Sequence, residues 1–402
     1  MRYSTPAHVA NGLRQLVTDL HAWRGGHDPG LDGVVCGRTE LIGFYADRVE
    51  YSGEDVADLV DDGLFESVIW LLLNRRPADP EQLADTCSIL SDCAVVDEPA
   101  ADMMAAMPLQ VRALDLLPLC VSMLACFDPT PNDVTVEASH SRFWRLLGQL
   151  PVLLHVAFGG RLCEGRAQAP GGELPLTFAG RLLQILRQDE SPPSPLEEHA
   201  MNAVLTCECL TEMRPACFSS RIFGSVVPDV VGGLKSAVSM FTAQLRNDPF
   251  AWMATRFRSF KSPDHAQAWF EARKSPTMPF GFQDDERDYR SLLLRTQCRE
   301  LLGSMENIVM ESSAARLEEV LAKNGLYPTV DWTAARLLTL LQVPEDRISL
   351  AIGIARLVGW AAQGLEQHES GVPLLPSLRY AHDDRTHNDG GDNDVSSADD
   401  VC

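Results

Sequence analysis

The stretch that decides the fold is residues 326–363, which read LYPTVDWTAARLLTLLQVPEDRISLAIGIARLVGWAAQ. Residues 348–362 are apolar on nearly every side of a helical wheel, and Arg356 is their only charged residue. A helix that is hydrophobic all round is buried, and a buried cation requires an anionic partner or ligand. The segment is too short to cross a bilayer and carries a cation at its middle. We therefore predict a core built around Arg356 and the carboxylate of Asp331; the simplest alternative is a purely structural ion pair.

The composition is typical of a mostly α-helical globular protein. The chain has 402 residues, enough for one large domain or two ordinary ones. Its hydrophobic fraction of 45% can form a sizeable core. Helix-forming residues fill the long segments, and strict alternation of polar and apolar residues is rare. The best strand-like region is 30–53, where two short β-prone runs follow turns at Gly33 and Gly37.

The net charge limits the partners of this chain. The 34 Lys and Arg residues against 56 Asp and Glu residues give a formal charge of −22. Binding to nucleic acid or to an anionic membrane surface requires a basic surface. We therefore predict neither of these partners, while a local basic pocket for a small anionic substrate remains compatible with the charge.

The cysteines indicate a reducing compartment. There are 11 of them, an odd number, and they are scattered along the chain. No secretory signal pattern opens the sequence, so we predict free thiols and a cytoplasmic location. Cys207 and Cys209 lack a second pair and have the wrong spacing for a zinc knuckle, so we predict no metal site.

Capping signals and composition place several boundaries. Ser194, Pro195 and Glu197 form the pattern of a capping box at a helix start. Residues 381–402 contain seven aspartates and one arginine and almost no apolar residue, which indicates a disordered acidic tail. Further helical patterns occupy residues 54–74, 81–95, 99–126, 140–158, 174–187, 216–225, 229–246, 263–273, 286–303 and 305–324.

Several motifs, in this order and spacing, resemble those of the citrate synthase family. Residues 30–34 (GLDGV) and 65–74 (FESVIWLLLN) resemble the opening of these enzymes. Residues 212–221 (EMRPACFSSR) are similar to the family's E-L-N-P-S-T-F-x-x-R. The best matches are residues 327–331 (YPTVD), which resemble YPNVDF, and residues 355–360 (ARLVGW), which resemble AR-x-x-GW. The resemblance spans roughly residues 30–380.

The resemblance implies an all-α fold with a large helical domain and an inserted small helical domain. It places the large domain at residues 1–207 and 319–380, and the small domain at 208–318. It also implies a homodimer, and a cleft that closes on oxaloacetate and acetyl-CoA. We expect no tightly bound cofactor. The co-substrate that the resemblance implies is a CoA thioester.

The same resemblance assigns roles to individual residues. Asp331 matches the family's catalytic base and Arg356 matches a carboxylate-binding arginine; Arg290 is a weaker match to another. The three catalytic histidines of the family fall on Thr211, Arg246 and Phe282. Thr211 would orient the substrate, Arg246 would stabilise an enolate, and Phe282 would shape an apolar pocket.

Each residue also has a simpler interpretation. Asp331 can be a helix N-cap, Arg246 a solvent-facing charge at a helix end, and Arg290 a member of surface ion pairs. Thr211 and Phe282 can serve packing alone.

Two functions remain open at this point. One is a divergent citrate synthase-like enzyme that forms or cleaves a carbon–carbon bond next to a carbonyl, acting on a small carboxylate or acyl-CoA. Loss of one positioned donor typically costs about 10²–10³ in rate, so three missing histidines argue against ordinary citrate synthesis. The alternative is a catalytically silent paralogue, which would regulate or stabilise an active synthase as its partner in a heterodimer.

Overall fold

The computed structural model describes residues 34–376, except 109, 164–165, 169–176, 190, 273–279 and 285–286. The chain divides into two compact units, and the larger one is Thr39–Pro373. The smaller unit combines Met1–Arg38 with Leu374–Cys402, of which only 34–38 and 374–376 are described. The predicted acidic tail at 381–402 therefore lies outside the described residues.

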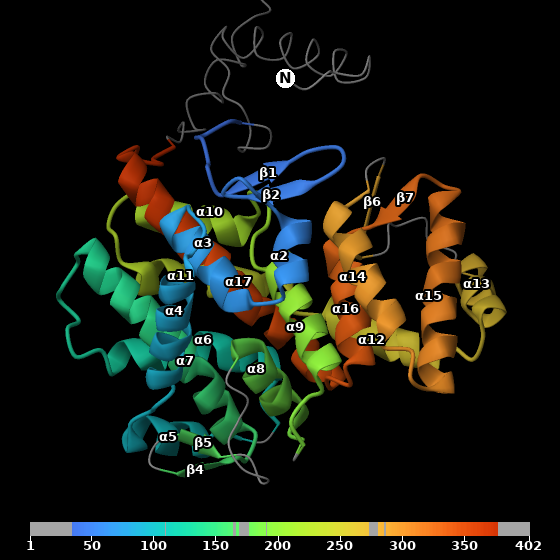
Figure 1. The fold of residues 1–402 in the computed structure, drawn as a ribbon, viewed down its shortest axis with the longest axis horizontal. Helices are drawn as coiled ribbons and strands as arrows, with labels where there is room; N and C mark the ends of the chain where they lie inside the picture. Colours follow the sequence, from blue (N-terminus) through green and yellow to red (C-terminus); the bar gives the residue numbers. More distant parts are fainter. Residues whose placement is uncertain are drawn as a thin grey trace, which may run out of the picture. The chain divides into compact units, whose positions relative to one another are not determined.

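The larger unit is built from α-helices, which confirms the predicted all-α class (Figure 1). The helices are α2 (Val56–Asp62), α3 (Phe65–Asn74), α4 (Pro80–Asp92), α5 (Glu98–Ala105), η1 (Ala113–Asp115), α6 (Leu116–Cys126), α7 (Val136–Ala157), α8 (Phe178–Arg187), α9 (Pro195–Glu208), α10 (Pro215–Gly224), α11 (Val230–Gln244), α12 (Pro249–Ser259), α13 (Pro263–Glu271), α14 (Tyr289–Glu300), α15 (Met305–Ala322), α16 (Val330–Leu340) and α17 (Glu345–Ser370).

The described part of the chain also contains three small antiparallel sheets. The predicted strand-like region 30–53 contains β1 (Ile42–Phe44) and β2 (Val49–Tyr51). The strand β3 (Glu54–Asp55), in residues predicted to be helical, completes the sheet in the order β1-β2-β3. A second sheet pairs β4 (Arg161–Cys163) with β5 (Arg166–Gln168). A third pairs β6 (Phe282–Asp284) with β7 (Leu326–Pro328), and it sets Phe282 opposite Pro328. This last pairing brings a distant loop to the residues that lead into α16.

The helix α17 is the core element that the sequence predicts, although it is longer than expected. It runs over 26 residues and packs against α9, α10, α11, α12 and α16. By length and composition α17 could span a membrane, which corrects the expectation from residues 348–362 alone. However, 94% of its most apolar window is buried inside the protein, as in the core helix of a globular domain.

Glycines allow the close packing of two helices on α17. A Cβ atom on Gly359 would overlap the carbonyl oxygen of Cys209, directly after α9. On the other side, a Cβ atom on Gly224 of α10 would overlap the carbonyl oxygen of Gly364. The glycine of the ARLVGW motif therefore lets the end of α9 lie directly against α17, one turn away from Arg356.

The start of α9 agrees with the sequence. Ser194 accepts a hydrogen bond from the Glu197 amide, and the Glu197 carboxylate accepts one from the Ser194 amide at 2.8 Å. This is the predicted capping box, with Pro195 at the first helical position.

Three helix predictions need correction. The single helical pattern predicted over 54–74 forms β3 and two helices, α2 and α3, because α2 ends with the C-cap Gly63, whose φ is 66°. The single helix predicted over 99–126 is interrupted after Ala105, because Pro108 cannot continue a helix and the chain re-enters one only at Ala113. The helix α12 was not predicted at all. It begins with Pro249. The preceding residue, Asp248, has a φ of 40°, and its side chain accepts a hydrogen bond from the Ala251 amide and so caps the helix.

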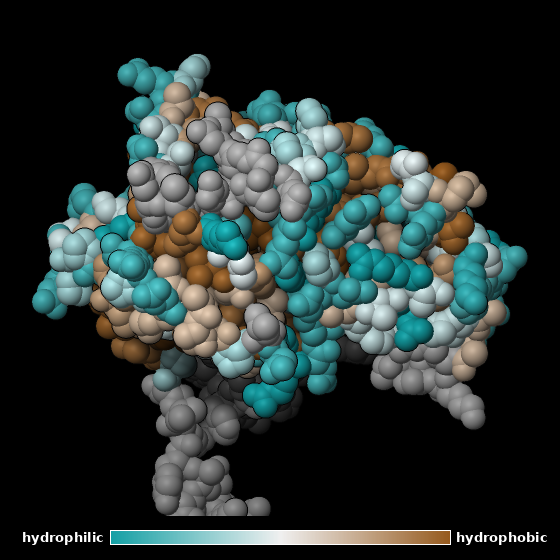
Figure 2. All heavy atoms as spheres, turned by 90° about the horizontal axis from the view of Figure 1, so that it is seen from below, coloured by the Kyte–Doolittle hydropathy of each residue, from teal (hydrophilic) through white to brown (hydrophobic). Residues whose placement is uncertain are grey.

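The surface is mixed in character. On the face drawn in Figure 2, hydrophobic and hydrophilic residues are interspersed. Exposed large apolar side chains include Val226, Met305 and Val35. Exposed apolar residues are normal for folded proteins and need no special explanation.

Candidate active site

Asp331 sits in the first turn of α16, held there by backbone contacts. The Thr329 amide donates to the Gly281 carbonyl at 2.8 Å, and the Val330 amide donates to Asp288 Oδ2 at 3.0 Å. Thr329, not Asp331, occupies the N-cap position, so the alternative in which Asp331 caps the helix is wrong. With the cap elsewhere, the Asp331 side chain is directed to other partners.

The main partner of Asp331 is Arg356. One guanidinium nitrogen, Arg356 Nη2, donates to Asp331 Oδ1 at 2.5 Å and to Glu208 Oε2 at 2.7 Å. All three side chains are almost fully buried, with Glu208 at 0% exposure. The predicted core around one carboxylate and one guanidinium is therefore present, but it contains a second carboxylate. Arg356 also lies over the ring of Phe241, 5.3 Å from its centroid.

Arg214 completes the charged group from the rim. Its Nη1 atom lies 3.4 Å from Asp331 Oδ2, and its side chain remains 46% exposed. We call Asp331, Glu208, Arg356 and Arg214 the charge cluster. Because three of its members are buried and Arg214 reaches solvent, Arg214 is the member that a dissolved anion meets first.

The pKa values of the two carboxyl groups in the charge cluster are shifted in opposite directions. Burial raises the pKa of Glu208, and this effect outweighs the opposing charge of Arg356. Burial also acts to raise the pKa of Asp331, but Arg356 and Arg214 together hold that pKa below its ordinary value. Asp331 is consequently ionised in the free protein, and Glu208 is the carboxyl group that takes up a proton more readily.

Arg290 is buried, at 4% exposure, which corrects the alternative that assigned it to surface ion pairs. Its Nε and Nη2 atoms each lie 3.1 Å from an oxygen of Asp288, and its Nη1 donates to the Leu210 carbonyl at 2.8 Å. It therefore stabilises the chain directly after α9. Its predicted role in substrate binding stays a prediction.

Thr211 and Phe282 are both buried, and they contact different parts of the structure. Thr211 Oγ1 lies 3.3 Å from Cys217 Sγ, and the Thr211 carbonyl accepts from Gln363 Nε2 at 3.3 Å. The Phe282 ring packs edge-on against Trp332, with 4.6 Å between the ring centroids. Phe282 thus contacts the residue next to Asp331, while the proposed roles of both residues remain predictions.

Arg246 does not join the charge cluster. It lies in the turn after α11 and its side chain is exposed. The described residues provide no ion pair for it, and only its carbonyl oxygen is engaged, by Arg112 Nη1 at 3.2 Å. This placement matches the alternative of a solvent-facing charge at a helix end, and its part in enolate stabilisation is untested.

An apolar pocket beside Phe282 is nearly filled. Its volume is about 20 Å³, close to that of a single water molecule, whereas ligand pockets usually measure roughly 300–1,000 Å³. Its walls come from α12, α13, α15, α16 and β6, and they include Trp332, Phe257 and Phe282. In this conformation the pocket is part of the packed core.

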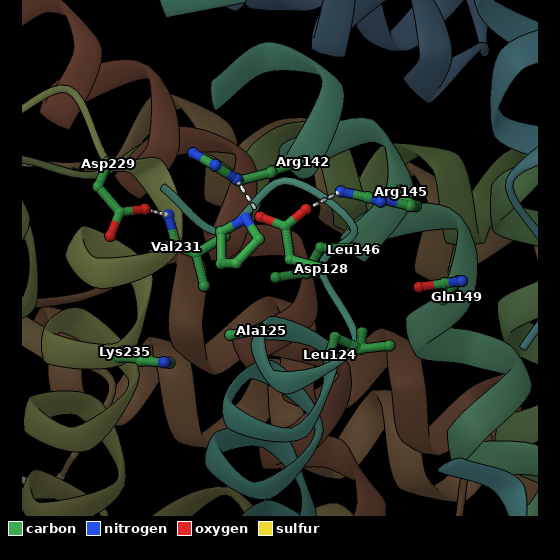
Figure 3. A pocket seen from close by; sticks show the side chains of 11 residues that line it. Leu124, Ala125, Asp128, Arg142, Arg145, Leu146, Gln149, Asp229, Val231 and Lys235 are labelled. Atoms are coloured by element: carbon green, nitrogen blue, oxygen red, sulfur yellow. Dashed lines mark hydrogen bonds and ion pairs between the residues drawn. The ribbon is translucent and has the colours of Figure 1, made fainter. Parts of the chain in front are cut away.

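A larger pocket of about 220 Å³ lies between α6, α7 and α11 (Figure 3). At its centre, Asp128 forms ion pairs with Arg142 and with Arg145, the latter at 2.7 Å. None of the site residues predicted from the sequence lines this pocket. The ion pairs tie the loop after α6 to α7, which gives the pocket a structural explanation.

Sequence reasoning missed Glu208 and Arg214 as members of the site. A signal for Glu208 was present, because it is the only charged residue between Met201 and Thr211. A lone acid in an apolar helix is buried only with a partner. Arg214 gave no comparable signal in its immediate sequence, because the charged residue Glu212 stands close to it.

Neither metal ligands nor disulfides organise the described part of the chain. Within the described residues no group of three or more His, Cys, Asp and Glu side chains could hold a metal ion. The cysteines described there, including Cys207 and Cys209, are free thiols.

Comparison with known proteins gives the class first. The fold matches solved citrate synthases at 16% sequence identity. One is the enzyme of Thermoplasma acidophilum, solved as a ternary complex with carboxymethyl coenzyme A and oxaloacetate, at a TM-score of 0.76. The alignment covers 92% of this chain and 97% of that one. A second is the enzyme of Thermotoga maritima MSB8, at a TM-score of 0.71 and with the same coverage.

Sequence comparison then gives the family. The family profile described as "Citrate synthase, C-terminal domain" matches residues 30–376, and the chain therefore belongs to the citrate synthase family. Citrate synthase 2 of Bacillus subtilis strain 168 is 24% identical over 362 residues, covering 89% of this chain and 96% of that protein. 2-Methylcitrate synthase 1 of Corynebacterium glutamicum is 24% identical over 373 residues, covering 87% and 94%. The family resemblance inferred from the motifs is confirmed.

Proposed function

We propose that this protein is a divergent citrate synthase-like enzyme that forms or cleaves a carbon–carbon bond next to a carbonyl group. Its substrates would be a small carboxylate or keto acid and an acyl thioester. The observation that carries the proposal is Asp331, a carboxylate that is ionised and buried beside two guanidinium groups. Removal of an α-proton uses a positioned base together with groups that stabilise the negative charge of the enolate, and Asp331 and the two guanidinium groups suit these two roles.

In this proposal Asp331 accepts the proton from the carbon next to the carbonyl of the donor. The electron pair of that C–H bond moves into the enolate, whose carbon attacks the acceptor carbonyl. The C=O π bond of the acceptor breaks, and the alkoxide that forms takes up a proton from water. Arg214 and Arg356 hold the carboxylate of the substrate and offset the negative charge that develops. In the ligand-free protein the pKa of Asp331 is lowered, which makes its carboxylate a weak base. Ligand binding must therefore first separate Asp331 from Arg356 before Asp331 can act as an effective base.

The residues at the positions of the family's histidines favour chemistry other than ordinary citrate synthesis. Phe282 cannot donate a hydrogen bond, Thr211 cannot transfer a proton near neutral pH, and Arg246 remains protonated. We expect no thiol release from acetyl-CoA with oxaloacetate. Turnover at the rate of ordinary citrate synthases would contradict this expectation.

The direct test is exchange of α-protons in deuterium oxide. Keto acids and acyl thioesters are incubated with the protein, and deuterium incorporation is followed by NMR. The Asp331→Asn variant should lose about 10²–10⁴ in exchange rate, the usual contribution of a positioned base. Asp346→Asn is the matched control, because Asp346 is exposed at the start of α17. Exchange that does not depend on Asp331, or no exchange with any compound of these classes, would refute the proposal.

A second function is favoured by one observation, the neutralisation of Arg356 by Asp331 and Glu208. An arginine that already holds two carboxylates suits a silent subunit paired with an active synthase. Copurification from the native host distinguishes the two cases. Recovery of a histidine-containing homologue supports the silent subunit, and recovery of self-assembled dimers alone supports the enzyme.

A further inference from the structure

Glu208 has an environment that simple ion pairing does not explain. It ends α9, its side chain is fully buried, and only one of its two oxygens has a partner. Glu208 Oε1 has no hydrogen-bond partner among the described residues, and neither does Arg356 Nε. A buried polar atom without a partner is destabilising, and more so when it is charged. The contact between these two residues is therefore incompletely satisfied on both sides.

The charge balance of the cluster also indicates that Glu208 is incompletely neutralised. Two carboxylates share one nitrogen of Arg356 in the buried part of the charge cluster. Among the described residues, the other guanidinium that forms an ion pair with this part is that of Arg214, which lies on the far oxygen of Asp331 and is partly exposed. Arg290 also lies near Glu208, but it is paired with Asp288. The buried part thus carries one carboxylate more than a single guanidinium requires. Of the two carboxylates, Asp331 has a second cation, and Glu208 is the weaker-held one.

We infer that Glu208 is an internal counter-ion that occupies Arg356 in the free protein, and that a ligand carboxylate binds by taking its place. The inference rests on the proposed function, because it takes Arg356 to be the group that receives the substrate carboxylate. Glu208 sets the affinity of the site for carboxylates, since every such ligand competes with it for Arg356. The class of ligand is a small organic anion with at least one carboxylate.

Protonation of Glu208 should weaken its ion pair with Arg356. The charged groups that face it are Arg356 on α17, Asp331 on α16 and Arg290 on α14. Burial raises the pKa of Glu208, so it is neutralised at a higher pH than an ordinary glutamate. A neutral Glu208 holds Arg356 less tightly. Anion binding should therefore strengthen as the pH falls towards the pKa of Glu208, while Asp331 stays ionised because its pKa is lowered.

The test compares ligand affinity in the full-length protein by isothermal titration calorimetry at pH 7.5. The probes are succinate and oxaloacetate, with dimethyl succinate as the uncharged reference. Glu208→Gln keeps the shape of the side chain and removes its charge. We expect this variant to bind the dianions about tenfold or more tightly than the wild type, with no gain for dimethyl succinate. The matched control is Glu212→Gln, which removes the same charge from an exposed position four residues away and should bind as the wild type does.

A second measurement covers the case in which Glu208→Gln does not fold. Wild-type protein is titrated with ethane-1,2-disulfonate, whose charge does not change between pH 8 and pH 5.5. Binding that tightens as the pH falls supports the inference. Equal affinity in Glu208→Gln and wild type, pH-independent binding of the disulfonate, or no binding of any anion to either protein would overturn it.

The outcome is separable from that of the proposed function. Tighter anion binding in Glu208→Gln without any α-proton exchange would leave the counter-ion role intact and remove the enzymatic one. Exchange in the wild type with an unchanged KM in Glu208→Gln would do the opposite.

Discussion

Asp331 and Arg356 are in direct contact, with Arg356 Nη2 2.5 Å from Asp331 Oδ1 and both side chains buried. The two residues come from different helices, α16 and α17, and each lies in a motif that resembles one of the citrate synthase family. The contact makes the guanidinium of Arg356 the main source of favourable charge for two buried carboxylates. The stability of this region therefore depends on one cation.

Arg356→Met should destabilise the protein by about 3–5 kcal/mol, because it leaves Asp331 and Glu208 without their shared partner. The change is measured by urea denaturation. Arg246→Met serves as the control and should change stability by about 0.5 kcal/mol or less, since its side chain is exposed. A small effect at Arg356 would mean that the two carboxylates are protonated or solvated in solution.

Gly359→Ala should also destabilise the protein, by about 3 kcal/mol or more, because the added Cβ overlaps the Cys209 carbonyl oxygen. The relevant measurement is the melting temperature by calorimetry. Gly303→Ala is a suitable comparison, since nothing lies within 4 Å of its added Cβ and it should melt with the wild type. Equal melting of both variants would show that α9 and α17 are not packed this tightly.

Arg290→Met distinguishes a structural from a ligand-binding role. Arg290 holds the Leu210 carbonyl and Asp288, so we expect a loss of about 3 kcal/mol in the free energy of unfolding without ligand. Arg287→Met, at an exposed position over the Tyr327 ring, should cost about 1 kcal/mol or less. Unchanged stability with weakened anion binding would restore the ligand-binding role that the motif suggests.

Asp128→Asn tests the acid sensitivity of the loop that follows α6. Burial acts to raise the pKa of Asp128, but a bond from the Thr130 amide and the charges of Arg142 and Arg145 lower it overall. A carboxyl with a lowered pKa contributes stability above its unfolded pKa, about 3.9, and loses that contribution as the pH falls through the folded pKa.

The variant should therefore melt below the wild type at pH 7, and the gap should close as the pH falls below about 4. Melting temperatures from pH 7 to pH 3 follow this directly. A gap that is constant with pH would assign the effect of the substitution to lost packing in place of lost charge.

Local rules predicted much of the fold. The capping box at Ser194, the hairpin region before Tyr51 and the buried α17 follow from hydrogen-bonding preferences and hydrophobic periodicity, which act over a few residues. The helix α12 was missed although Asp248 followed by Pro249 is a helix-start signal of the kind used at Ser194 and Pro195. Only the left-handed backbone conformation of Asp248 has no signal in the sequence.

The site was only partly predictable. The pairing of Asp331 with Arg356 followed from the need to neutralise a buried cation. Which further charges join them depends on how α9 and α10 meet α16 and α17, and those contacts are set by tertiary packing. Glu208 and Arg214 therefore appeared only in three dimensions, and Arg246, placed in the site by motif alignment, lies in an exposed turn.

Asp288 links two helix starts, because it caps α14, pairs with Arg290 and accepts from the Val330 amide. The hydrogen bond from the Val330 amide to Asp288 therefore makes the first turn of α16, which carries Asp331, dependent on the placement of α14. Through Arg290, the position of Asp331 also depends on the residues that directly follow α9.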